Sequence, residues 1–491
     1  MTKNILLLFI IIIAAITAMT ASCTDDEEFT SGSDMRLEFS CDTLRFDTVF
    51  TTIPSATHRF KIYNRNDRGL YLPSVRLASG GQSGFRLNLD GQTGTSFTDV
   101  NINHDDSLFC FVEVTVPAHN SDTPLLLSDS IQFIHTDGTI QQVVLEAYGQ
   151  DIIMLRDCHI TDSLTLSGIR PYVIYDSLSI NPGATLTLTP GTTLCFHSGA
   201  SLAVRGTLIA QGTTDQPVTF RGDRTDHLFT YLPYDRTDSQ WGGITFYAES
   251  HGNRLVNCDI HGGSYGVRGI SQDSLYILNT AIHNVAGDAL CLTDSRAVIH
   301  GVQLSNAGGN CATVIGGTID FTHCTLAQFY PWASSHGSAL YFANVADGEV
   351  HPLHQLQFVN SIITGYSHDE VYADRMPDSD APFNYQFSGS LVNTVLTDAD
   401  QPYFTQCLLD TIGDTSYRRL TEKELEAPRP MPREGNFHLL DLDNYIYDFA
   451  LDSLSLAIGL GIDNVPADCQ TDMRGTRRPD RHPDAGCYQK K

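Results

Sequence analysis

A repeat of 22 residues runs through the stretch from Leu255 to Phe329, which reads LVNCDIHGGSYGVRGISQDSLYILNTAIHNVAGDALCLTDSRAVIHGVQLSNAGGNCATVIGGTIDFTHCTLAQF. Two apolar registers of this repeat are Ile260, Ile282, Leu304 and Leu326, and Leu255, Ile277, Ile299 and Phe321. A fixed period with apolar residues in phase is typical of a solenoid, in which each coil buries its face against its neighbours. Alternation within each unit indicates strands rather than helices. The stretch therefore predicts an all-β fold, a parallel β-helix with about 22–24 residues per coil.

The predicted β-helix extends over residues 151–412. In its first coils, apolar pairs recur every eight residues, at Leu178/Ile180, Leu186/Leu188, Leu194/Phe196 and Leu202/Val204. Three such strands complete a coil, and turn sequences such as Pro190-Gly191 suit its sharp corners. Insertions at 221–240, 329–357 and 365–387 interrupt the period. Such insertions become loops on one flank of a solenoid, commonly the binding flank.

Residues 36–150 have a different pattern. Short alternating runs, among them Phe60-Lys61-Ile62-Tyr63 and Phe85-Arg86-Leu87, are separated by turn clusters such as Asp90-Gly91. About seven short strands at regular turn spacing predict an immunoglobulin-like β-sandwich. No tryptophan lies in this region, so the antibody-type domain with its buried tryptophan is excluded.

The charge balance limits the partners of the protein. The 491 residues carry a formal net charge of −27, and no lysine lies between Lys61 and Lys423. Nucleic acid is therefore not an expected partner, because binding to phosphates needs a basic surface.

The N-terminus predicts export and lipid anchoring. Residues 1–22 have the charged start, apolar core and small-residue end of a signal peptide. The run Thr20-Ala21-Ser22-Cys23 resembles a bacterial lipobox, with Thr20 where leucine is usual, and this resemblance implies lipidation of Cys23. An acidic tether follows over 23–35, and its run Thr24-Asp25-Asp26-Glu27-Glu28 resembles the signal that sends some Gram-negative lipoproteins to the outer face of the outer membrane. An ordinary cleaved signal or a short membrane span is the alternative.

Two further resemblances concern the β-helix and the C-terminus. The run Pro190-Gly191-Thr192, with Gly206-Thr207-Leu208 and Trp241-Gly242-Gly243-Ile244, resembles the opening coils of right-handed parallel β-helix repeat proteins, many of which are exported to the cell surface. Residues 413–491 resemble a choice-of-anchor Q domain. The matching positions are Ser455 to Gly459, Asp472, Gly475, Arg478 and Pro483 to Tyr488. This implies cell-surface placement, and we expect the segment to close the open end of the solenoid as a cap.

The sequence offers few of the residues that cleavage of a polysaccharide needs. A polysaccharide lyase needs a base, often lysine or arginine, and the predicted β-helix contains no lysine. A glycoside hydrolase needs two opposed carboxylates, whereas Asp259 and Asp288 stand alone in the sequence. The sequence favours a non-catalytic surface protein that binds glycan or another macromolecule. The alternatives are a polysaccharide lyase or glycoside hydrolase, and a structural component of the cell surface.

Few residues are candidates for a site. His261 and His283 lie one repeat apart and are candidate metal ligands, although a solvent-facing side-chain ladder explains them more simply. In the insertions, aromatic rings that could stack on sugars are Tyr231, Tyr234, Tyr330 and Trp332. The alternative is that these rings fold back to cover the coil they leave.

Two weaker predictions concern calcium and a disulfide. Asp441-Leu442-Asp443 and Asp378-Ser379-Asp380 could bind calcium, but neither has the twelve-residue loop of a strong site. Cys469 and Cys487 are the predicted disulfide pair, because export leads to an oxidising compartment.

Overall fold

The computed structural model describes residues 29–30, 34–367, 369–395, 403–410, 433–463 and 466–491. Cys23, the predicted signal peptide and most of the acidic tether therefore lie outside the described residues. Among the residues that are described, no helix is long and apolar enough to cross a membrane. The chain divides into two compact units, Met1–Gln150 and Asp151–Lys491.

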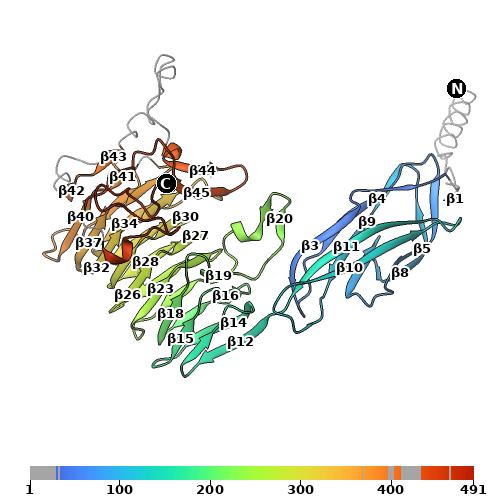
Figure 1. The fold of residues 1–491 in the computed structure, drawn as a ribbon, viewed down its shortest axis with the longest axis horizontal. Coiled ribbons are helices and arrows are strands. Elements are labelled where there is room, and N and C mark those ends of the chain that lie inside the picture. Colours follow the sequence, from blue (N-terminus) through green and yellow to red (C-terminus); the bar gives the residue numbers. More distant parts are fainter. Residues whose placement is uncertain (1–28, 31–33, 368, 396–402, 411–432, 464–465) are drawn as a thin grey trace, which may run out of the picture. The chain divides into compact units, whose positions relative to one another are not determined.

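The first unit is a β-sandwich, as the sequence predicts (Figure 1). One sheet has the strand order β1 (Phe29–Thr30), β5 (Gly69–Leu77), β10 (Leu125–Ile134), β11 (Ile140–Gln150) and β3 (Thr43–Phe50), with β8 (Ser96–Ile102) also pairing β5. The other has the order β2 (Leu37–Phe39), β4 (His58–Asn64), β9 (Asp106–Val114), β6 (Phe85–Leu89) and β7 (Gln92–Gly94). Alternate residues of the strands point inward, and Phe85, Phe133 and Ile62 are among the largest fully buried side chains. This burial supplies the core that the alternating pattern implies.

The second unit is a right-handed parallel β-helix whose coils have three strand rows, which we call faces A, B and C (Figure 1). Face A contains β16 (Thr193–Phe196), β19 (Val218–Gly222), β24 (Cys258–His261), β27 (Ala281–Val285), β30 (Gln303–Ala307), β33 (Thr325–Gln328), β38 (Ile362–Gly365) and β41 (Leu391–Asn393). Face B contains β17 (Leu202–Val204), β22 (Ile244–Phe246), β25 (Val267–Ile270), β28 (Leu290–Thr293), β31 (Ala312–Ile315), β34 (Leu340–Ala343) and β39 (Val371–Asp374). Face C contains β15 (Thr185–Leu188), β18 (Thr207–Gln211), β23 (Asn253–Val256), β26 (Leu275–Leu278), β29 (Arg296–His300), β32 (Gly317–Thr322), β37 (Leu353–Val359), β40 (Phe383–Ser388) and β42 (Phe404–Thr405).

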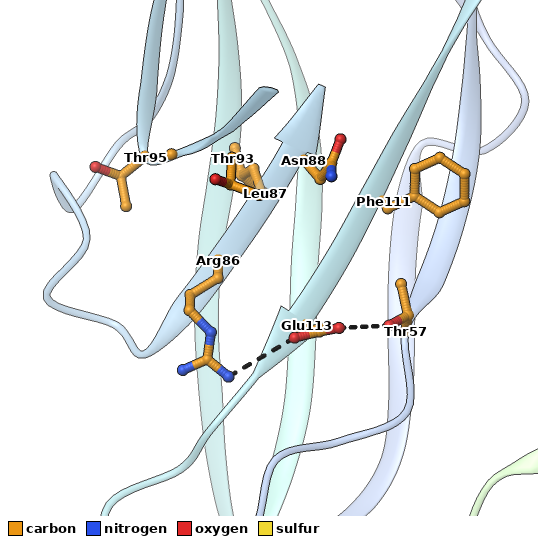
Figure 2. A pocket seen from close by; sticks show the side chains of 9 residues that line it. Thr57, Arg86, Leu87, Asn88, Thr93, Thr95, Phe111 and Glu113 are labelled. Atoms are coloured by element: carbon orange, nitrogen blue, oxygen red, sulfur yellow. Dashed lines mark hydrogen bonds and ion pairs between the residues drawn. The ribbon is translucent and has the colours of Figure 1, made fainter. Parts of the chain in front are cut away.

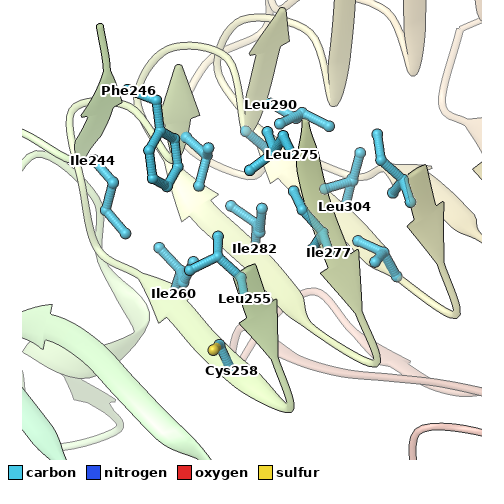
Figure 3. Packing of buried hydrophobic residues seen from close by; sticks show 14 of the residues in the cluster. Ile244, Phe246, Leu255, Cys258, Ile260, Leu275, Ile277, Ile282, Leu290 and Leu304 are labelled. Carbon is cyan, nitrogen blue, oxygen red and sulfur yellow. The ribbon is translucent and has the colours of Figure 1, made fainter. Parts of the chain in front are cut away.

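The repeat is confirmed residue by residue. On face A, Ile260 and Ile282 are partners on the paired strands of adjacent coils, and so are Leu304 and Leu326. Figure 3 shows Ile260, Ile282 and Leu304 inside the coils, and Leu326 belongs to the same buried cluster. Full burial of one such side chain stabilises the fold by about 1.5–3 kcal/mol, so the ladders account for much of the stability.

One position of the repeat, in the turn between faces C and A, is occupied mainly by asparagine. Asn257, Asn279, Gly301, His323 and Asn360 each have a positive φ, between 47° and 63°. Asparagine tolerates this left-handed conformation better than most residues, and glycine has no side chain to hinder it. The register is therefore selected by backbone geometry.

The described residues of the C-terminal segment, 433–463 and 466–491, lie along the flank of the β-helix. Its hairpin, β44 (Phe437–Asp441) and β45 (Ile446–Leu451), buries Phe437 and Phe449 against outward-facing residues of face A. Those residues are Ala327, Ile362 and Leu391. We expected a cap on the open end of the solenoid, but the contacts of the described residues are lateral. The physical reason is that face A presents apolar residues in its later coils, and covering them is favourable.

The C-terminal motif residues have structural roles. Asp472 accepts hydrogen bonds from the backbone N–H groups of Arg474 and Thr476, and Gly475 between them has a φ of 76°. Asp484 likewise accepts from the backbone N–H of Gly459. These aspartates therefore stabilise tight turns.

The predicted disulfide pair, Cys469 and Cys487, is unbonded in the structure, and the disulfide stays a prediction. Both Cys469 and Cys487 are free thiols, and burial raises the pKa of each to about 12. Cys487 donates its backbone N–H to Thr325 of face A, whereas Cys469 lies beside His300 of face C. The two cysteines thus belong to contacts with different faces of the solenoid.

Candidate functional site

Two successive coils of face A carry a polar cluster on their outer side. Because Ile260 points inward from β24, its neighbours Asp259 and His261 point outward. His283 occupies the equivalent position on β27 and pairs with His261, with ring centroids 5.0 Å apart. The predicted histidine ladder is therefore present.

An inserted loop completes the cluster. Residues 223–240 leave face A after β19, form the hairpin β20 (His227–Phe229) and β21 (Leu232–Pro233), and return through the 3-10 helix η1 (Tyr234–Arg236). Trp241 then stacks on Phe196 at 4.4 Å and donates its indole N–H to the carbonyl of His261. This anchor brings Asp235 onto His261.

His261 lies between two carboxylates. Its Nε2 is 2.9 Å from Oδ1 of Asp235, and its Nδ1 is 3.1 Å from Oδ1 of Asp259. The same Asp259 oxygen is 2.9 Å from Nε2 of His283, and Asp235 is also 2.9 Å from Nη2 of Arg221. Asp259 therefore does not stand alone, which corrects the interpretation of the sequence.

The electrostatics favour a charged histidine. Burial alone would lower the pKa of His261, but the charge of Asp259 and the hydrogen bonds of both aspartates raise it to about 10. Burial opposes ionisation of Asp259 and Asp235 as well, yet His261 lowers the pKa of both carboxyls, that of Asp259 well below its usual range. At neutral pH, His261 is therefore an imidazolium held between two carboxylates.

This arrangement has two chemical consequences. Donor atoms of Asp259, His261 and His283 lie within 4.8 Å of one another, which is close enough to ligate a metal. A metal would first have to displace the proton of His261, because an imidazolium has no free lone pair. Without a metal, the cluster acts as an ion-pair network that holds the inserted loop on the coil.

The predicted aromatic residues of the inserted loop have different environments. Tyr231 is 49% exposed and stacks on Phe229, so the end of the β20–β21 hairpin presents two rings to solvent. Tyr234 instead lies under the guanidinium of Arg224, and the Cζ atom of Arg224 is 4.0 Å from the centre of the tyrosine ring. Only Tyr231 of this pair is available as an exposed platform.

Of the other two predicted aromatics, Tyr330 lines a hollow, whereas Trp332 is not part of its wall and contacts one of the lining residues, Tyr445. Tyr330 is buried and donates its hydroxyl hydrogen bond to Asp238 of the inserted loop, while Trp332 stacks on Tyr445 at 4.4 Å. The hollow has a volume of about 380 Å³ and is lined by Tyr330, Pro331, Ala333, Ser334, His336, Tyr366, Leu442 and Tyr445. Sequence reasoning missed Tyr366 and Tyr445 as part of this wall, since they come from segments distant in sequence.

The inserted loop, the hollow and the C-terminal hairpin are connected. Arg236 donates a hydrogen bond from Nη1 to the carbonyl of Asn444, in the turn between β44 and β45. Asp441, a residue of one predicted calcium site, accepts hydrogen bonds from the backbone and side chain of Asn444. This carboxylate therefore stabilises the turn, and both calcium sites stay predictions.

A second hollow lies on the sandwich (Figure 2). It has a volume of about 630 Å³ and is lined by Thr57, Arg86, Leu87, Asn88, Thr93, Gly94, Thr95, Phe111 and Glu113. Glu113 accepts a hydrogen bond from Thr57 and lies 3.8 Å from Arg86.

No protein-family profile and no curated protein matches the sequence. Among solved structures, the periplasmic alginate epimerase AlgG is 11% identical, with 52% of this chain and 84% of that chain covered and a TM-score of 0.24. The catalytic domain of a GH87 alpha-1,3-glucanase is 9% identical, with coverages of 73% and 87% and a TM-score of 0.19. A family 123 glycoside hydrolase from Clostridium perfringens is 7% identical, with a TM-score of 0.18, and the match spans 24% of this chain and 30% of the hydrolase. Similarity this low carries no inference about activity.

Proposed function

We propose that the protein is a lipid-anchored, outward-facing protein of a Gram-negative outer membrane. We propose further that it binds a glycan in the hollow lined by Tyr330, Tyr366 and Tyr445. The observation that carries this proposal is the cluster of three tyrosines, Tyr330, Tyr366 and Tyr445, around a space of about 380 Å³. Small-molecule sites have volumes of about 300–1,000 Å³. Flat aromatic rings offer large apolar faces with polar edges, which suit the faces and hydroxyl groups of sugars.

Charge favours one class of glycan. With a net charge of −27, the protein repels polyanions at long range. We therefore expect a neutral or cationic glycan rather than an acidic one. A purely structural component of the cell surface, the other non-catalytic alternative, would bind no free glycan in this hollow.

A glycan array with the chain from residue 36 onward tests the proposal. The chain is expected to bind neutral oligosaccharides, and Tyr445→Ala is expected to weaken binding about tenfold, equivalent to about 1.4 kcal/mol. Tyr148→Ala is the matched control, because Tyr148 is a half-exposed tyrosine of the sandwich. Absence of any glycan ligand, or an equal loss in both variants, would overturn the proposal.

One observation favours a second candidate, a polysaccharide-cleaving enzyme. Asp235 and Asp259 bind the same imidazole from opposite sides, so two carboxylates share one site on the outer side of face A. Glycoside hydrolysis uses such a pair, although it needs one carboxyl protonated, and both of these have a lowered pKa. Incubation with neutral and acidic polysaccharides tests this candidate. New reducing ends or unsaturated products that disappear in Asp259→Asn would establish it over simple binding.

Lipid anchoring is tested separately. Cys23→Ala is expected to release the protein from the membrane fraction, with Cys41→Ala as the control. Unchanged membrane retention of Cys23→Ala would contradict lipidation.

A further inference from the structure

A second mixed cluster joins the C-terminal segment to face C. The 3-10 helix η5 (Ala467–Cys469) lies beside His300 of β29 and Tyr276 of β26. Oδ2 of Asp468 accepts a hydrogen bond of 2.6 Å from the hydroxyl of Tyr276 and lies 3.0 Å from Nδ1 of His300. One ligand atom each of His300, Asp468 and Cys469 lies within 4.8 Å of the others.

These three donors suit zinc better than the harder cations. Thiolate and imidazole are preferred ligands of zinc, and carboxylate is also common, whereas magnesium and calcium prefer oxygen alone. Zinc binds sulfur at about 2.3 Å and nitrogen or oxygen at about 2.0–2.2 Å in a tetrahedron. Ligand atoms of such a site lie about 3–4 Å apart, so the observed cluster needs only small side-chain shifts.

A buried arginine provides an independent indication. Arg478 is 3% exposed, and none of its three guanidinium nitrogens has an acceptor among the described residues. Its charge interacts with the carboxylates of Asp472 and Asp484 as well as with Cys469 and Cys487, and burial lowers its own pKa. A buried guanidinium without an acceptor is costly, and a neutral thiol is a weak acceptor. Coordination of a metal converts a neutral thiol into a thiolate, which is a stronger hydrogen-bond acceptor for such a guanidinium.

We propose that His300, Asp468 and Cys469 bind one zinc ion, which fastens the C-terminal segment to the β-helix. Binding replaces the S–H bond of Cys469 by an S–Zn bond, and the proton leaves to solvent. Tyr276 donates to the ligating carboxylate and orients it. The side chains of His300 and Asp468 are 12% and 31% exposed, so water reaches the fourth position. This proposal does not depend on the proposed glycan binding.

The cluster around His261 is a weaker candidate for the same ion. Both ring nitrogens of His261 contact carboxylates, and the raised pKa keeps its proton in place. His300, in contrast, uses only Nδ1 in this contact.

Metal analysis of the full chain tests the proposal. The protein is stripped with a chelator, loaded with zinc and gel-filtered, and we expect one zinc per chain. His300→Ala and Asp468→Asn are expected to weaken zinc binding at least tenfold. His438→Ala is the matched control, since His438 also pairs with an aspartate, Asp448, on the same C-terminal segment.

Cobalt substitution identifies the thiolate. Cobalt-loaded wild type is expected to have a sulfur-to-cobalt charge-transfer absorption, which Cys469→Ser loses and Cys291→Ser keeps. A wild type that retains no zinc would overturn the proposal. Zinc that persists in His300→Ala but is lost in Asp259→Ala would also overturn it, because the ion would then belong to the cluster around His261.

Discussion

The early and late coils of face A occupy the same place in the repeat but present different chemistry. At the outward position of β24 and β27 stand His261 and His283, and the inserted loop covers His261 with Asp235. At the same position of β33 stands Ala327, next to the outward residues Ile362 and Leu391, and the C-terminal segment covers these apolar residues. The inward ladder is continuous through both regions. The inward-facing residues therefore determine the solenoid itself, whereas the outward-facing residues determine which segment covers each coil.

The largest loss of stability is expected when the apolar cover of the late coils is removed. Phe449→Ala is expected to lower the free energy of unfolding by about 3–5 kcal/mol, because a buried ring is lost and a cavity remains. Urea denaturation measures the loss, and limited proteolysis is expected to cleave the C-terminal segment first. Leu454→Ala, at a residue that is 68% exposed, is the control and should change little. Equal stability of the two variants would contradict apolar docking of this segment.

The early coils should respond to loss of charge instead. His261→Ala leaves Asp235 and Asp259 without their shared cation and is expected to cost about 2–3 kcal/mol, less than a fully buried pair, since both carboxylates are partly exposed. Proteolysis should then begin within residues 223–240 rather than in the C-terminal segment. His351→Ala is the control, because His351 makes one comparable contact with Asp294. Unaltered cleavage of the loop would show that its other contacts, such as those of Trp241 and Tyr330, hold it without His261.

The stability that the cluster around His261 contributes to the early coils is expected to depend on pH. Because the pKa of His261 is raised from 6.5 to about 10, its contribution is complete below pH 6.5 and is lost as the pH rises to about 10. The lowered pKa values of Asp259 and Asp235 add stability above their usual value of 3.8, which is lost in acid. The stability difference between wild type and His261→Gln should therefore be largest near pH 5 and smallest near pH 10 in denaturation experiments. A difference that is constant with pH would contradict a charged His261.

The smallest expected effect concerns the link between the two regions. Tyr330→Phe removes the hydrogen bond to Asp238 and is expected to cost about 1 kcal/mol. Thermal unfolding measures this loss, and Tyr276→Phe, which also removes a hydroxyl bonded to an aspartate, allows comparison with face C. A neutral Tyr330→Phe variant would show that the inserted loop is held without this bond.

The candidate site could be predicted only in part. The spacing of His261 and His283 follows from the repeat, and the i, i+2 position of Asp259 on the same outward side was a signal that could have been used. Asp235 could not be found, because it belongs to an insertion with no period. The same holds for Tyr445 beside Trp332, since the hairpin that carries Tyr445 docks on the β-helix from a distant part of the chain.

The sequence by itself determined the all-β class, the period of 22 residues and the inward ladders, because apolar periodicity is a local property that each coil repeats. Only the tertiary structure decided where the covering segments lie. It placed the C-terminal segment on the flank instead of the end, and it brought Asp468 to His300 across 168 positions of sequence. The physical reason is that docking depends on matching apolar area and charge between surfaces, and no local pattern encodes which surfaces will meet.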